Sequence, residues 1–367
     1  MAAGGVFLTG FPGFLGTALV ERLLSRYPAR CPIVCLVQPA YYRLAQMRVA
    51  RICHEHRILG ERILLYEGDI TRPDLGLGER YFLLTKQIAE IYHLAALYDL
   101  GLDRDRGMAV NVTGTRHVLQ FAERCGLDLR RFHYVSTCFV SGRYPGVFRE
   151  SDLDKGQSFN NCYEETKYLA EVEVQRRMRR GLPVTIYRPS IVVGDSKTGA
   201  TQKYDGLYFF IRWLLGQSAF AMVPIFDDPT CFEFNFVPRD FVVDAIAHLS
   251  ALDSSLGKVY QLCDPNPMRV DQVIELMGES TGRRVLRVRL PRSFAKGLVK
   301  HVPLVQKMVG IEPAVMDYFV HPTRYTCDNM LADLRASDIC CPPFASYVEN
   351  LVRFTQRHSD ISTRAMA

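Results

Sequence analysis

Short apolar runs alternate with helix-like patterns over the first half of the chain. Helices are predicted at about 15–26 and 108–124 and from Tyr163 onwards, and each follows an apolar run of strand length. Short strands separated by helices are typical of parallel βαβ units. The pattern therefore predicts an α/β fold built on a doubly wound parallel sheet. Its strands are expected at 6–8, 33–37, 62–67, 88–94, 132–136 and 184–188.

From about residue 191 the pattern changes to a long apolar and aromatic stretch at 206–226. Its length approaches that of a membrane span, but polar and helix-breaking residues interrupt it. A buried helix lining a pocket is therefore the preferred interpretation. The interrupting residues are Arg212, Gly216, Gln217 and Pro224.

The later segments suggest two domains. Residues 232–251 are expected to return to the first domain as a strand and a helix, and a further helix is predicted at 270–281. The remainder forms a smaller mixed α/β C-terminal lobe. The expected division is a first domain at 1–190, completed by about 232–264; a lobe at 191–231 and 265–358; and a disordered tail at 359–367.

Gly10, Gly13 and Gly16 stand in a turn between the first predicted strand and the first predicted helix. Glycines let backbone N–H groups approach a bound anion, and the positive end of the helix dipole favours it. The turn therefore indicates a pyrophosphate site. A plain strand-to-helix turn explains the glycines equally well on their own, and Pro12 is an unusual insertion between them.

A second pattern combines Tyr163 with Lys167 on the helix that follows the fifth strand. Residues four apart share a helix face, and a nearby ammonium lowers the pKa of a tyrosine towards the range of an acid/base catalyst. A solvated helix face is the alternative for this pair alone. The preceding strand ends in two hydroxyls, Ser136 and Thr137, which makes the combination more specific.

A series of short motifs stands at strand ends and helix starts along the chain: Thr9-Gly10-x-x-Gly13-x-x-Gly16, Gly68-Asp69-Ile70, His93-Leu94-Ala95-Ala96, Asn111-Val112-Thr113-Gly114-Thr115, Ser136-Thr137, Tyr163-x-x-x-Lys167 and Arg188-Pro189-Ser190. Together they resemble the extended short-chain dehydrogenase/reductase family over nearly the whole chain. The phrases at 187–199 and 235–245 resemble the male-sterility-like branch of fatty-acyl and thioester reductases more than the nucleotide-sugar epimerases. The resemblance implies a Rossmann-like sheet with a dinucleotide along its strand ends.

In that family Asp69 would hydrogen-bond the adenine ring, with Ile70 packed on it, and Tyr98 would reach the nicotinamide ribose. Asn111 resembles a supporting asparagine, although helix N-capping explains it equally well. The cofactor residues implied by the resemblance are Gly10, Phe11, Pro12, Gly13, Phe14, Leu15, Gly16, Gln38, Arg43, Asp69, Ile70, Leu94, Ala95, Ala96, Tyr98, Asn111, Tyr163, Lys167, Arg188, Pro189, Ser190 and Ile191.

The end of the second strand bears on the choice of cofactor. NAD binding usually places an acidic residue there, about 20 residues past the glycines, but this strand runs into Gln38, with Arg43 and Arg48 beyond it. An arginine is suited to a 2′-phosphate because its planar fork binds two oxygens. The branch usually has arginine where this chain has Gln38. We expect NADP(H), with NAD(H) as the alternative.

The implied chemistry is hydride transfer to a carbonyl carbon of a thioester, aldehyde or ketone. Tyr163 would donate a proton to the oxygen, Thr137 would hydrogen-bond it, and Lys167 would hold the ribose and lower the pKa of Tyr163. Ser136 lies one residue deeper in the strand. The expected substrate is hydrophobic, or linked to an acyl carrier or CoA. The alternatives are a nucleotide-sugar epimerase or dehydratase with tightly bound NAD, and a non-catalytic dinucleotide-binding protein.

Composition adds limits. The net charge of +6 over 367 residues comes from scattered basic side chains, which gives no reason to expect nucleic acid. The N-terminus lacks the pattern of a signal peptide, and the eleven cysteines show no metal or disulfide spacing, so a cytoplasmic protein without metal is expected.

Two surfaces carry expectations about partners. Residues 292–309 mix lysines with apolar side chains, which indicates either a peripheral membrane contact or carrier rim, or short helices of the lobe with solvated lysines. By resemblance, a homodimer would form through the helices at 108–124 and 163–180.

Overall fold

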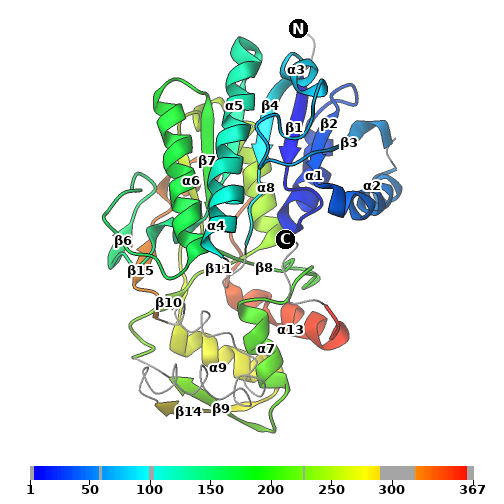
Figure 1. Ribbon diagram of the computed structural model, residues 1–367. Helices are drawn as coiled ribbons and strands as arrows, with labels where there is room; N and C mark the ends of the chain where they lie inside the picture. The colour runs from blue at the N-terminus through cyan, green and yellow to red at the C-terminus, as the bar shows by residue number, and fades with distance from the viewer. Residues whose placement is uncertain are drawn as a thin grey trace.

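The computed structural model describes residues 4–57, 60–98, 103–225, 228–289, 318 and 320–361. A central parallel sheet runs through it in the order β12-β7-β5-β4-β1-β2-β3 (Figure 1). The doubly wound α/β fold predicted from the sequence is confirmed, and the strand order reverses between β1 and β4. The strands are β1 (Gly5–Thr9), β2 (Ile33–Val37), β3 (Ile63–Glu67), β4 (Ile88–His93), β5 (Arg131–Val135), β7 (Val184–Pro189) and β12 (Val259–Leu262).

Helices cover both faces of the sheet because its strands are apolar on both sides. Val6 and Leu8 of β1 join one buried cluster, whereas Phe7 between them joins the other. The first cluster packs against α1 (Phe14–Arg26), α2 (Tyr42–His56), α8 (Arg239–Leu249) and α12 (Asp328–Leu334); the second packs against α3 (Arg80–Thr85), α5 (Thr115–Cys125) and α6 (Cys162–Arg179).

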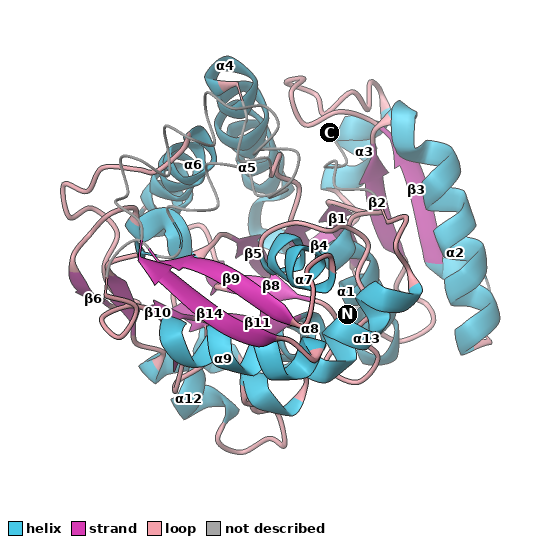
Figure 2. Ribbon diagram, turned by 90° about the horizontal axis from the view of Figure 1, so that it is seen from below, coloured by secondary structure: helices cyan, strands magenta, loops and turns pink. Residues whose placement is uncertain are grey.

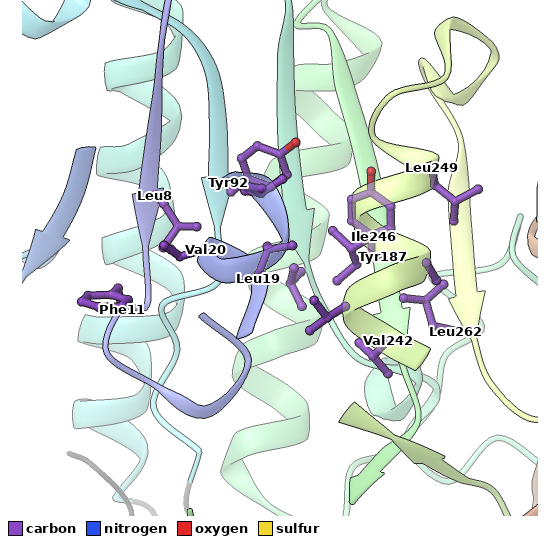
Figure 3. Close-up of a cluster of buried hydrophobic side chains, with 14 of the residues drawn as sticks. Leu8, Phe11, Leu19, Val20, Tyr92, Tyr187, Val242, Ile246, Leu249 and Leu262 are labelled. Carbon is purple, nitrogen blue, oxygen red and sulfur yellow. The ribbon is translucent and has the colours of Figure 1, made fainter. Parts of the chain in front are cut away.

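Figure 3 shows the first cluster where α1 and α8 meet over the sheet. Leu19 and Val20 of α1 lie between Leu8 of β1 and Ile246 of α8, and all four side chains are fully buried. This packing fixes the N-terminal end of α1 beside the carboxyl end of β1, which is where the glycine turn lies.

The predicted lobe has its own buried cluster, drawn from residues 193–352. Figure 1 places it below the central sheet, and Figure 2 shows the β9–β14 pair as a separate ribbon. Its elements are β8 (Ile191–Val193) paired with β11 (Phe236–Pro238), β9 (Phe220–Ile225) with β14 (Arg284–Arg289), β10 (Glu233–Phe234) with β13 (Met268–Arg269), and the helices α7 (Leu207–Leu215), α9 (Val270–Thr281) and α13 (Val348–Arg357).

Shorter elements connect these parts. β6 (Gly146–Phe148) pairs with β15 (Thr323–Tyr325), so the C-terminal segment returns to the edge of the first domain. The remaining elements are α4 (Arg104–Gly107), a π-helical turn η3 (Met108–Gly114) and the 3-10 turns η1 (Pro39–Tyr41), η2 (Gly60–Arg62), η4 (Gly126–Asp128), η5 (Cys138–Ser141), η6 (Asp253–Ser255) and η8 (Phe344–Ser346).

Within the stretch at 206–226 the helix is α7, which ends at Leu215; after a turn, Phe220 starts the strand β9. Gly216 caps the C-terminal end of the helix, in keeping with the weak helix propensity of glycine. The strand expected after residue 232 joins β8 instead of the central sheet.

Among the residues described, no helix is long and apolar enough to cross a membrane. The basic segment at 292–309 lies outside the described residues, as does most of the tail expected at 359–367.

Candidate active site

A cavity of about 760 Å³ runs along the carboxyl ends of the strands, at the point where the strand order reverses. This is the position at which open α/β sheets bind ligands. The predicted site residues that line it are Gly10, Phe11, Pro12, Gly13, Phe14, Leu15, Gly16, Gln38, Asp69, Ile70, Leu94, Ala95, Ala96, Tyr98, Ser136, Thr137, Tyr163, Lys167, Ser190 and Ile191.

The glycine turn is closed too tightly for side chains. Gly10 has φ +96°, and a Cβ there would lie 2.9 Å from the Ala95 nitrogen. A Cβ at Gly13 would lie 2.7 Å from the Gly10 carbonyl oxygen, and a Cβ at Gly16 would overlap that same oxygen. The first turn of α1 carries no acidic side chain, so its open N–H groups offer a site for an anion.

Asp69, which lines the cavity, is held by its own turn. Its Oδ1 accepts hydrogen bonds from the backbone N–H and the hydroxyl of Thr71, both at 2.8 Å. Ile70 packs against Gly114, where a Cβ would come within 2.7 Å of the isoleucine side chain. A short strand-end turn therefore presents a fixed carboxylate and an apolar side chain to the cavity.

Asn111 does not line the cavity and does not cap a helix. Its Oδ1 accepts from the Leu97 N–H at 2.7 Å, and its Nδ2 donates to the Leu97 carbonyl at 3.2 Å and to the Thr166 hydroxyl at 3.0 Å. Asn111 thus ties the loop after β4 to α6. Its contribution to the site is to hold that loop in place.

Tyr163, Lys167 and Thr137 all line the cavity. The Asn161 side chain caps α6 by accepting the Glu164 N–H at 3.0 Å, which sets Tyr163 and Lys167 one turn apart on the same side. The Thr137 side chain hydrogen-bonds Tyr163, and its Oγ1 accepts the Phe139 N–H at 3.2 Å. The Thr137 hydroxyl, just past the end of β5, therefore lies next to the Tyr163 hydroxyl.

The pKa of Tyr163 differs from the sequence-based expectation that Lys167 lowers it. Burial raises the pKa of Tyr163, and the hydrogen bond from Thr137 only partly opposes this. Lys167 is not among the groups that shift the pKa of Tyr163. Its ammonium donates to the Val135 carbonyl at 2.9 Å and to the Tyr134 hydroxyl at 3.2 Å. Tyr163 is a protonated phenol near neutral pH, which is the state that a proton donor requires.

Lys167 supplies a prediction about pH. Burial lowers its pKa to about 8, against the opposing effect of Glu171, so the side chain is cationic below that pH and neutral above it. We expect the affinity for a dinucleotide to fall as pH rises through about 8. Titrating the dinucleotide at a series of pH values measures this, with protein fluorescence alone as the control for folding. An affinity that stays constant through this range would exclude Lys167 as the responsible group.

Arg188, predicted to bind cofactor, is instead fully buried in an ion pair. Its guanidinium bonds Glu171, with Nη2 at 2.6 Å and Nε at 3.1 Å, and donates to the Asp152 carbonyl at 2.7 Å. Ser136 donates to the same carboxylate at 2.6 Å. The group joins the strand ends to α6. Pro189 and the exposed Arg43 likewise do not line the cavity.

Breaking this ion pair is expected to destabilise the fold. Glu171→Gln leaves the Arg188 charge buried without a counter-ion, which typically lowers the free energy of unfolding by about 3–5 kcal/mol. The matched control is Glu165→Gln, whose partner Arg104 is half exposed, with an expected loss below about 1 kcal/mol. Urea unfolding of both variants measures the difference, and equal losses would contradict the role given to Glu171.

Several residues that line the cavity beyond Tyr98 and Tyr163 were not among the site residues predicted from the sequence. Tyr98 packs edge-on against Tyr163 with ring centres 4.8 Å apart, and the Lys203 ammonium lies 4.7 Å from the Tyr98 ring centre and 3.0 Å from Asp205. Only the first residues of the aromatic stretch line the cavity. The missed lining residues include Phe139, Thr201, Gln202, Lys203, Asp205, Phe236 and Tyr318.

Comparisons with known proteins bear on the family. The family model described as male sterility protein matches residues 8–246. Aldehyde reductase lnbA of Aspergillus flavus is 26% identical over 77% of this chain and 29% of its own length. Isonitrile lipopeptide synthase of Streptomyces coeruleorubidus is 31% identical over 92% of this chain and 23% of its own length. The chain thus spans less than a third of either relative.

The alignment of this chain with one solved structure covers nearly the full length of each of the two chains. The terminal R domain from the myxalamid PKS-NRPS biosynthetic pathway is 27% identical, covers 98% of this chain and 92% of its own, and superposes with a TM-score of 0.82. Together with a family model that matches well over half of the sequence, this agrees with the resemblance seen in the motifs. The chain belongs to the male sterility protein family, and with it to the NAD(P)-dependent oxidoreductases of the extended short-chain dehydrogenase/reductase type.

Proposed function

We propose that this chain is an NADP(H)-dependent reductase of a carbonyl group, in a thioester, aldehyde or ketone, carried by a hydrophobic or carrier-bound substrate. The observation that supports it most is the group Thr137, Tyr163 and Lys167, gathered in one cavity with the glycine turn. Similarity to an aldehyde reductase and to an R domain supports the same class of reaction.

The residues present fit a dinucleotide. The three glycines leave a cradle that any Cβ would fill, the uncapped start of α1 faces it, and Asp69 and Ile70 stand at its other end. When bound, a reduced nicotinamide supplies the hydride. Gly10, Gly13 and Gly16 would hold the pyrophosphate, and Lys167 would hold the ribose hydroxyls.

Tyr163, next to Thr137, would supply the proton that the reduced carbonyl oxygen needs. Tyr163 donates its phenolic proton to the carbonyl oxygen as negative charge develops there, while Thr137 hydrogen-bonds the same oxygen. Because Thr137 is 5% exposed and Tyr163 is partly buried, these bonds form largely away from bulk water, where they are stronger. With a thioester, the resulting hemithioacetal releases the thiol and leaves an aldehyde.

The preference for NADP(H) rests on the end of β2. Gln38 lines the cavity at the position where NAD enzymes place a carboxylate, so no negative charge there repels a 2′-phosphate. Gln38→Glu should weaken NADPH binding by at least about tenfold and leave NADH binding almost unchanged. Gln46→Glu, the same change at an exposed position of α2, is the control. Equal effects on NADPH and NADH would contradict the assignment.

A screen of NADPH consumption tests the reaction itself. Acyl-CoA, acyl-carrier, aldehyde and ketone substrates of graded chain length would be compared. Rates that rise with chain length support a hydrophobic or carrier-bound substrate. Purified protein that carries stoichiometric NAD and converts UDP-sugars would contradict the proposal and favour the epimerase alternative; dinucleotide binding without any turnover would favour the non-catalytic one.

The homodimer through η3–α5 and α6 stays a prediction, as does a cytoplasmic location. Sedimentation at micromolar concentration tests the first, since a monomer there would remove it. A peripheral membrane contact through 292–309 concerns residues outside those described, and vesicle binding tests it directly.

A further inference from the structure

A small cavity adjoins the substrate side of the large one. Its volume is about 20 Å³, which is room for one water-sized group. Four residues line both cavities: Phe139, Ser190, Ile191 and Tyr318. The Phe139 N–H donates to Thr137 Oγ1, so the shared wall begins next to the group proposed to hold the carbonyl oxygen. A substituent close to the reacting carbon could therefore reach the small cavity.

His321 stands in the wall of this small cavity with one ring nitrogen unpaired. The residue is 7% exposed, and its Nε2 lies 2.7 Å from the Tyr325 hydroxyl. Its Nδ1 is buried and has no hydrogen-bond partner within the described ranges. Leaving a buried polar atom unpaired is unfavourable, and such atoms are rare. An unpaired nitrogen in the wall of a cavity of this size indicates that a small polar group, either a water molecule or part of a ligand, pairs with it.

The hydrogen-bond chain behind His321 defines what that group must do. Tyr325 lies between His321 and Ser141, with its hydroxyl 2.9 Å from Ser141 Oγ. Burial lowers the pKa of His321 to about 4, so near neutral pH the ring is uncharged and carries one N–H. If Tyr325 donates to Nε2, then Nδ1 carries the hydrogen; if Nε2 donates to Tyr325, then Nδ1 accepts. A hydroxyl group pairs with Nδ1 in both cases, because it donates and accepts.

We propose that the small cavity is a polar subsite of the substrate cavity, where His321 Nδ1 binds a hydroxyl group that the substrate carries near its reacting carbonyl. The proposal rests on the reductase function proposed above and specifies its substrate class: hydroxylated rather than plain acyl chains. A trapped water is the other group that would satisfy Nδ1, and the experiment separates the two.

The test is a position scan with aldehydes of equal chain length, unsubstituted or carrying one hydroxyl at each successive carbon from the carbonyl. We expect the wild-type protein to reduce one positional isomer with a kcat/KM at least about tenfold above that of the unsubstituted aldehyde, because a site built to bind a hydroxyl discriminates strongly against its absence. No preference for any isomer would overturn the subsite and leave a trapped water as the partner of Nδ1.

Two variants assign the preference to His321. His321→Gln keeps a polar group near the Nε2 position, facing Tyr325, but has none at Nδ1; His321→Asn keeps one near Nδ1 only. We expect the preference to disappear in the glutamine variant and to survive in the asparagine variant. A preference that persists in both would overturn the role of His321. The scan of the wild-type protein needs no variant, so a variant that fails to fold leaves the test intact.

The outcomes also distinguish a failure of the hydroxyl subsite from a failure of the proposed reductase function. If the wild-type protein reduces the unsubstituted aldehyde but ignores the hydroxyl, only the subsite is wrong. If it reduces none of the aldehydes and no thioester, the reductase function fails, and the subsite fails with it.

Discussion

Replacing Tyr163 by phenylalanine is expected to lower turnover by about 10²- to 10⁴-fold, which is the usual contribution of a positioned proton donor. The variant keeps the ring that packs edge-on against Tyr98, so the shape of the cavity is preserved. It removes only the hydroxyl that Thr137 holds. Dinucleotide affinity should therefore stay close to that of the wild type, and the loss should appear in kcat.

The matched control lies five residues further along the same helix. Tyr168→Phe removes a phenolic hydroxyl from α6 at a position that does not line the cavity, where the ring packs against Phe159. Its turnover should equal that of the wild type. Steady-state rates with NADPH and a reducible aldehyde, with binding of NADPH measured separately, compare the two variants. Undiminished turnover in Tyr163→Phe would remove this residue from the proposed mechanism.

The sheet could be predicted because its strands are buried on both faces. Such strands appear in the sequence as continuous apolar runs, and 33–37 corresponds residue for residue to β2 (Ile33–Val37). The glycine turn could be predicted because its tight packing leaves no room for any other residue at Gly10 or Gly16. Both signals are local, and each is written in consecutive residues.

The roles of single polar residues at strand ends were harder to predict. Arg188 lies near the end of β7 in a motif that points to the cofactor, yet its side chain pairs with Glu171 of α6. Asn111 likewise holds the loop at Leu97 rather than a ligand. A motif places a residue at the edge of the site, but the direction of its side chain depends on partners contributed by other elements.

The substrate side depends on contacts that are distant in the sequence. His321 and Tyr325 reach the cavity wall because β15 pairs with β6, more than 170 residues earlier in the chain. Neither the hydrophobic periodicity of the sequence nor the spacing of its motifs predicts the pairing of β15 with β6. The dinucleotide side of an open α/β fold is therefore accessible from sequence, whereas the side that selects the substrate requires the structure.

Gly16→Ala is expected to weaken dinucleotide binding by at least about tenfold, which corresponds to about 1.4 kcal/mol, because the backbone that holds the anion must move. The new Cβ would overlap the Gly10 carbonyl oxygen, so either α1 or the turn must move. Either movement shifts the backbone N–H groups that face the cavity. Crowding of the buried turn should also lower the free energy of unfolding by about 1–3 kcal/mol.

Gly60→Ala is the matched control for this change. Gly60 lies in η2, and a Cβ there would meet no atom of the described residues within 4 Å. Its variant should bind NADPH as the wild type does. Calorimetric titration of both variants with NADPH measures the affinity, and urea unfolding measures the stability. Wild-type affinity in Gly16→Ala would mean that the turn tolerates a side chain and that the anion is held elsewhere. A stability loss without a change in affinity would assign these glycines to packing alone.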